Sequence, residues 1–147
     1  MAPEIYDKAK YHTDGEYPKG RSPRQAYVHT GMFLGWLASK DLLSKEFEHD
    51  FVSDIQSFRE GKITGPQLYA RADGVLDGSM LSEEGNRFAR SYFEFEKGGF
   101  IADYEELLVQ DLPSFYHVED SWSNYRRLAA AIDQRYAQWK KETVRKN

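Results

Sequence analysis

The chain has 147 residues, which suits one domain with its own core and is short for two. A hydrophobic content of 40% with 15% aromatic residues excludes a disordered chain, and the absence of cysteine excludes disulfides, thiolate metal sites and a cysteine nucleophile. The net charge is −4, but residues 41–120 carry 18 acidic and seven basic side chains, which argues against nucleic acid as a partner and favours a basic protein.

The N-terminal residues do not form a secretory signal, because Glu4 and Asp7 interrupt a stretch that has no apolar run. The most hydrophobic stretch, residues 26–37, contains His29 and is well short of the roughly 20 residues that span a bilayer. We therefore expect a cytoplasmic protein without a membrane segment.

Residues 1–23 are expected to form an irregular segment that packs on the body, because glycine and proline punctuate them. Ser22 and Pro23 then predict a helix start. The following residues, to about position 39, are apolar on nearly all faces, which indicates a central buried helix. Gly31 and Gly35 lie one turn apart on it and predict close approach of a second helix.

The middle of the chain predicts several shorter helices. A second apolar stripe consists of Phe47, Phe51, Ile55 and Phe58, and Gly61 is placed to end that helix. A short helix restarts at residues 64–66 and ends at Gly74. Ser79 or Ser82 is expected to cap the next helix, which residues 98–99 break.

Residues 101–108 predict one or two further helical turns, and Asp120 or Ser121 is expected to cap a long final helix. Its stripe has a spacing of three or four residues throughout: Trp122, Tyr125, Leu128, Ala129, Ile132, Tyr136 and Trp139. Only residues 91–96 resemble a strand. The sequence therefore predicts an all-α fold, with residues 1–147 as one compact bundle of about six helices.

None of the four histidines is paired with another at the spacing of a helical metal site, so no metal and no cofactor are expected. His12 and Asp14 have the H-x-D spacing of facial-triad iron enzymes, but this spacing is common by chance and a loop-packed or solvated His12 is favoured. Residues 73–84 fit part of a calcium loop, although Val75 stands where a ligand is needed. Two Asp-Gly turns explain that segment without calcium.

His29 lies on the predicted buried helix, where a hydrogen-bonded core histidine is the ordinary interpretation. Residues 116–120 supply a phenol, His117 and the carboxylates of Glu119 and Asp120, which are ingredients of acid–base catalysis. Acidic residues before a helix are also expected for capping alone. A pocket that combines these groups with His12 and His29 is therefore an alternative hypothesis.

Several short patterns together resemble a family of small, uncharacterised bacterial proteins. They are Asp7-x-Ala9-x-x-His12, Gly15-x-Tyr17-Pro18, Ala26-x-x-His29-x-Gly31-Met32-Phe33-Leu34-x-Trp36, Asp73-Gly74, Glu84-Gly85-Asn86 and the segment 116–120. The resemblance supplies no catalytic residues. Small proteins of this kind resemble the immunity partners of bacterial toxins, so the resemblance implies a protein-binding role.

Our first hypothesis is a non-enzymatic immunity or inhibitor protein that occludes a basic toxin domain. Its expected contact residues, around the glycine turn at 98–99, are Glu94, Glu96, Phe100, Asp103, Glu105 and Glu106. The alternative is a small enzyme or ligand-binding protein with a pocket built from His12, His29, His117, Glu119 and Asp120. A structural protein or homo-oligomer remains a third possibility. A tight pocket in which two histidines meet a carboxylate favours the alternative, whereas a convex acidic face with exposed aromatics favours the first.

Overall fold

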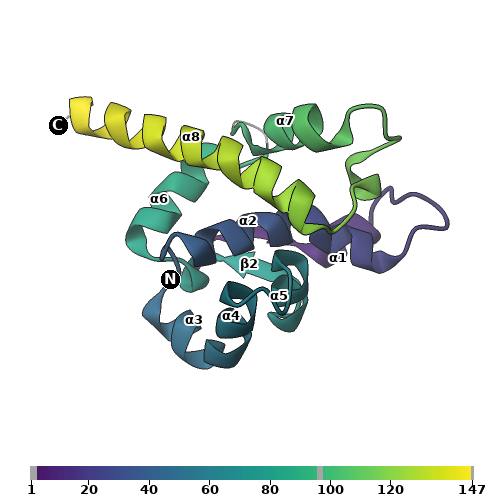
Figure 1. Ribbon diagram of the computed structural model, residues 1–147, viewed down its shortest axis with the longest axis horizontal. Helices are drawn as coiled ribbons and strands as arrows, with labels where there is room; N and C mark the ends of the chain where they lie inside the picture. Colours follow the sequence, from purple (N-terminus) through teal and green to yellow (C-terminus); the bar gives the residue numbers. More distant parts are fainter. Residues whose placement is uncertain (1–2, 96–97, 147) are drawn as a thin grey trace.

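The computed structural model describes residues 3–95 and 98–146, and it places α2 (Val28–Ser39) at the centre of the fold. Every residue of α2 from Val28 to Ala38 is buried. Figure 1 shows α8 (Trp122–Lys146) on one side of α2 and the helices α3, α4 and α5 on the other. The expected all-α fold with a central buried helix is therefore confirmed.

The predicted close approach occurs between α2 and α5 (Gly65–Arg71). A Cβ atom added to Gly31 would lie 2.4 Å from the Cα of Pro66, and one added to Gly65 would lie 2.3 Å from the carbonyl oxygen of Gly31. Such distances are well inside van der Waals contact, so the two backbones meet without side chains between them. The glycine spacing of α2 thus sets how deeply α5 packs into the core.

The second predicted helix is divided in two, α3 (Lys45–Asp50) and α4 (Val52–Arg59), because Phe51 leaves the helical region with φ −120° and ψ 31°. Phe47, Ile55 and Phe58 are nevertheless buried, as the apolar stripe predicted. Gly61 follows α4 with φ +78°, a left-handed conformation that glycine adopts without steric cost.

Helix α5 begins with a capping box. The Thr64 hydroxyl accepts a hydrogen bond from the backbone N–H of Gln67, and the Gln67 side chain accepts one from the backbone N–H of Thr64. The same hydroxyl donates to Asp120 Oδ2 over 2.7 Å, which ties α5 to the segment before α8. These bonds hold the glycine-rich start of α5 against α2.

We expect Thr64→Ala to lower the free energy of unfolding by about 1–2 kcal/mol, because it removes an N-cap and leaves Asp120 without its hydroxyl partner. Chemical denaturation followed by circular dichroism measures the change. Thr64→Ser keeps the hydroxyl and serves as the control. Equal loss in both variants would assign the effect to the lost methyl group instead.

The N-terminal segment is more regular than the sequence predicted. Strand β1 (Ile5–Lys8) pairs antiparallel with β2 (Val75–Asp77), and α1 (Ala9–Thr13) follows β1 directly. The backbone N–H of Ala9 donates to the carbonyl of Gly74 at the end of this sheet. The expectation of an irregular segment over 1–23 is therefore wrong for residues 5–13. Strands of four and three residues are too short to show a periodicity of two.

Residues 91–95, most of the one stretch that resembled a strand, do not form one, because Ser91 and Tyr92 end α6 (Glu83–Tyr92). Position 96 lies outside the described residues. Ser82 caps α6 through the backbone N–H of Gly85, and Ser121 caps α8 through the backbone N–H of Asn124. Both serines were among the predicted caps.

The chain after α6 packs on the side of α2 opposite α3, α4 and α5. It consists of α7 (Phe100–Tyr104), the π-helical turn η3 (Glu105–Val109), the 3-10 turn η4 (Phe115–His117) and α8. In the stripe of α8, Leu128 and Ile132 are fully buried, and the remaining members are partly buried against the core. Among the described residues, no helix combines the length and the apolar character needed to cross a bilayer.

Candidate functional site

Two of the sequence-predicted site residues meet in the core. His12 lies on α1 and His29 on α2, and their Nε2 atoms are 3.2 Å apart. The carboxylate beside them is that of Asp7 on β1, and Asp14, the partner suggested by the H-x-D spacing, is exposed at the end of α1. The three side chains therefore converge from three different elements, β1, α1 and α2.

Local structure explains how they converge. Pairing of β1 with β2 turns the Asp7 side chain inward, where it is 2% exposed, between half-buried neighbours. Helix α1 follows the strand directly, and its turn places His12 beside the Asp7 carboxylate. His29, on the first turn of α2, is 0% exposed.

The distances within this cluster are short. His12 Nε2 lies 2.9 Å from Asp7 Oδ1 and 3.0 Å from Asp7 Oδ2. His29 Nε2 lies 3.6 Å from Asp7 Oδ2, which is longer than a hydrogen bond. Thr30, next to His29 on α2, donates its hydroxyl to Asp7 Oδ2 over 2.5 Å. We call Asp7, His12 and His29 the core triad.

The surroundings set the protonation of two members. Burial opposes ionisation of Asp7, but the hydrogen bonds from His12 and Thr30 and the nearby imidazole of His29 outweigh it and lower the pKa of Asp7 to about 2. Burial lowers the pKa of His29, against the opposing effect of Asp7, and favours the neutral imidazole. At neutral pH the core therefore holds a carboxylate beside an uncharged His29.

Aromatic side chains surround the core triad. The Tyr116 hydroxyl lies 2.8 Å from Nδ1 of His12, and burial, with Asp7 and Tyr17 as smaller contributions, raises the pKa of Tyr116 to about 12. The ring of Phe115 lies 5.0 Å from that of His29, and the ring of Phe95 lies 6.1 Å from it. Within the core triad, Asp7 and His29 are buried, and His12 is partly exposed.

The other members of the predicted pocket have separate partners. His117 Nδ1 is 2.9 Å from the Ser114 hydroxyl, Asp120 accepts from Thr64, and Glu119 is exposed. Among the described residues, the only group with metal-ligand character is the core triad, which does not include them. Two of the five predicted pocket residues, His12 and His29, thus come together, and Asp7 supplies the carboxylate that the sequence argument assigned to Glu119 or Asp120.

The comparisons with known proteins assign this fold to a family. A family model described as a domain of unknown function, DUF7832, matches residues 5–118. The chain belongs to this family. Searches of curated proteins and of solved structures gave no match. All three members of the core triad lie within the DUF7832 region, whereas α8 follows its end.

Within the DUF7832 region, the segment expected to contact a partner divides into buried and exposed parts. Phe100 is fully buried, and Asp103 is 5% exposed because it accepts from the Tyr92 hydroxyl and pairs with Arg135 of α8. Their assignment as contact residues is therefore wrong. The helical spacing of positions 100, 103 and 104 on α7 places all three on the inward face.

The carboxylates of Glu105 and Glu106 are exposed at the end of α7, as the contact hypothesis requires. Glu94 is half-buried, and Glu96 lies outside the described residues. The partial calcium loop is also accounted for, since residues 75–77 form β2 and Glu84 accepts a hydrogen bond from Tyr136.

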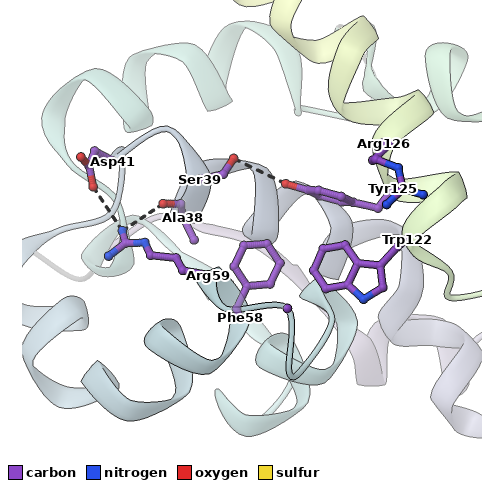
Figure 2. Close-up of a pocket in the computed structure, with 9 residues that line it drawn as sticks. Ala38, Ser39, Asp41, Phe58, Arg59, Trp122, Tyr125 and Arg126 are labelled. Carbon is purple, nitrogen blue, oxygen red and sulfur yellow. Dashed lines mark hydrogen bonds and ion pairs between the residues drawn. The ribbon is translucent and has the colours of Figure 1, made fainter.

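Five surface hollows of the DUF7832 chain, among its described residues, are each lined by residues other than the core triad. Figure 2 shows the hollow between the ends of α2 and α4 and the start of α8, where the rings of Phe58 and Trp122 lie 5.7 Å apart. At its rim, Arg59 donates to the Ala38 carbonyl and to Asp41. This hollow offers an aromatic wall rather than an acid–base pair.

Proposed function

We propose that the protein acts by binding another protein, as a cytoplasmic inhibitor of the immunity type that occludes a basic toxin domain. One observation carries the proposal: the exposed carboxylates of Glu105 and Glu106 line a shallow hollow together with Pro113 and Phe115. Acidic groups around an apolar patch suit a basic partner, because the charges speed association and the apolar centre supplies affinity.

The chain next to this hollow adds to the surface. Asp111 is exposed, and Leu112 is 41% exposed. Gln110, between η3 and Asp111, has a positive φ of 46°, an uncommon conformation for a residue other than glycine. We call Glu105, Glu106, Asp111, Leu112 and Phe115 the acidic turn. It presents three carboxylates and two apolar side chains on one short stretch of chain.

The alternative of a small enzyme or ligand-binding protein is supported by one observation, the meeting of His12 and His29 with Asp7. A substrate must reach such a centre, however, and Asp7 is only 2% exposed while His29 is 0% exposed beneath the rings of Phe95 and Phe115. We therefore favour protein binding over catalysis and treat the core triad separately.

A double charge reversal, Glu105→Lys with Glu106→Lys, tests the proposed surface. We expect the association rate with a basic toxin encoded by a neighbouring gene to fall about tenfold at low salt, because the variant repels the partner. The defect should shrink as salt rises, since screening weakens interactions between exposed charges. Association rates from biolayer interferometry at two salt concentrations provide the measurement.

The matched control reverses two exposed carboxylates on α3, with Glu46→Lys and Asp50→Lys, and changes the net charge by the same amount. In Figure 1, α3 and α7 lie on opposite sides of α2. Equal slowing in both double variants would reduce the effect to net charge and remove the acidic turn from the interface. Failure of every neighbouring basic toxin to bind the unmodified protein would reject the inhibitor role.

A further inference from the structure

We propose that the core triad of Asp7, His12 and His29 binds one divalent transition-metal ion, of the class to which Zn²⁺ and Fe²⁺ belong. The juxtaposition that carries this is one carboxylate oxygen and two imidazole Nε2 atoms gathered inside the core from β1, α1 and α2. The histidine spacing in the sequence indicated no metal site, because that search finds only ligands that share one element.

The triangle of ligand atoms has the size that a metal ion requires. Its sides are 3.2 Å between the two Nε2 atoms, 3.0 Å from His12 to Asp7 Oδ2 and 3.6 Å from His29 to the same oxygen. Bonds of about 2.0–2.2 Å at tetrahedral angles place ligand atoms about 3.3–3.6 Å apart. An ion above this triangle reaches all three atoms with small shifts.

Hydrogen bonding alone leaves His29 poorly satisfied. With His12 Nε2–H directed at Asp7, the only polar contact of His29 Nε2 within 3.5 Å, among residues 3–95 and 98–146, is that same nitrogen, at 3.2 Å. Nδ1 of His29 is buried and has no hydrogen-bond partner among the described residues. A neutral imidazole in this position lacks a strong partner, and coordination of Nε2 to a cation supplies one.

Charge points the same way. Asp7 is 2% exposed, and among the described residues no lysine or arginine forms an ion pair with it. Its polar partners are the Thr30 hydroxyl and the two imidazoles. A divalent ion at this point would add a positive charge beside the carboxylate, where two imidazole ligands are already placed.

Neighbouring side chains orient the ligands as they do around known metal sites. Thr30 donates to Asp7 Oδ2, and the Tyr116 hydroxyl contacts Nδ1 of His12, on the side of the ring away from the triangle. Coordination through His12 Nε2 puts the proton on Nδ1, which then donates to the Tyr116 oxygen. The Tyr116 contact leaves Nε2 of His12 facing the triangle, and Thr30 takes one of the lone pairs of Asp7 Oδ2, an oxygen that can accept a second partner.

The donor set selects the class of ion. Two imidazoles with one carboxylate suit Zn²⁺, Fe²⁺, Co²⁺ and Ni²⁺, whereas Mg²⁺ and Ca²⁺ prefer oxygen ligands. Because Asp7 and His12 belong to the N-terminal segment and His29 to the central helix, the ion joins the two. Metal binding is accordingly coupled to docking of β1 and α1 on α2.

The first test uses the full chain, stripped with a chelator and dialysed. Titration with Zn²⁺ is expected to show one ion per chain and to raise the melting temperature by roughly 5–10 °C at a free concentration about 100-fold above Kd. Bound Co²⁺ should give the visible absorption bands of an ion with nitrogen and oxygen ligands. Fe²⁺ added under anaerobic conditions should compete with Zn²⁺ for the site. Mg²⁺ should neither compete with Zn²⁺ nor raise the melting temperature. Absence of stoichiometric Zn²⁺, Co²⁺ and Fe²⁺ binding would overturn the proposal.

Variants then assign the site. Asp7→Asn keeps the shape of the side chain and should weaken Zn²⁺ binding about 100-fold, and His29→Ala should abolish it. His49→Ala and Asp14→Asn, which change exposed residues outside the triad, serve as matched controls and should bind as the unmodified chain does. If His29→Ala fails to fold by circular dichroism, Asp7→Asn decides the question. Unchanged affinity in a folded Asp7→Asn variant would place any bound ion elsewhere.

Discussion

Replacing Trp36 with alanine is expected to lower the free energy of unfolding by about 3–5 kcal/mol, because a large side chain at the centre of the core is lost. Trp36 is 0% exposed on α2, and its ring lies 5.4 Å from Phe88 and 5.3 Å from Tyr136. Its indole N–H donates to Asp133 Oδ1 on α8 over 2.9 Å, so the variant also loses a contact between two helices.

Thermal unfolding should show this loss as a fall of roughly 10–15 °C in melting temperature. Trp36→Phe is the control, since it keeps much of the apolar volume and removes only the N–H donor, and Asp133 retains its ion pair with Lys40 at 3.0 Å. The phenylalanine variant should lose clearly less stability. A near-neutral Trp36→Ala would contradict the central position of α2.

Replacing Gly31 with alanine is expected to cost at least about 3 kcal/mol, at the upper end for overpacking in a core. The added methyl group would meet the backbone of α5, 2.4 Å from Pro66 Cα and 3.1 Å from the Gly65 carbonyl carbon. Backbone atoms cannot rotate away as a flexible side chain can, so α2 and α5 must separate.

Gly99→Ala is the matched control for this substitution. The nearest heavy atom to a Cβ at Gly99 is 3.5 Å away, an ordinary contact, and φ there is −98°. Urea denaturation should therefore give a much lower free energy of unfolding for Gly31→Ala than for Gly99→Ala. Comparable stability of the two would show that α2 and α5 do not touch through their backbones.

The sequence predicted those parts of the fold that depend on neighbours along the chain. Three of these parts are local sequence patterns: the apolar surface of residues 28–38, the stripe that includes Leu128 and Ile132, and the serine caps. The β1–β2 sheet was missed because its strands lie about 70 residues apart and neither shows alternation on its own. Pairing over that distance is decided by tertiary structure.

The candidate site was predicted in part for the same reason. Histidines 12 and 29 were singled out by residue type, but their partner Asp7 precedes His12 across a strand–helix junction, where no helical or strand spacing applies. The error at Phe100 and Asp103 is different. Their helical spacing was visible in the sequence, and the surrounding acidic charge was given more weight than that spacing.

The ion pair between Asp103 and Arg135 bears on where this chain can be truncated for expression. Arg135 holds both oxygens of a buried carboxylate within the DUF7832 region, yet it belongs to α8, after the end of the matched residues. Leu128 and Ile132 of the same helix complete the core. A fragment ending at residue 118 therefore keeps a buried negative charge without its cation and opens an apolar face to water. We therefore expect the matched region, residues 5–118, to fold stably only when α8 is expressed with it.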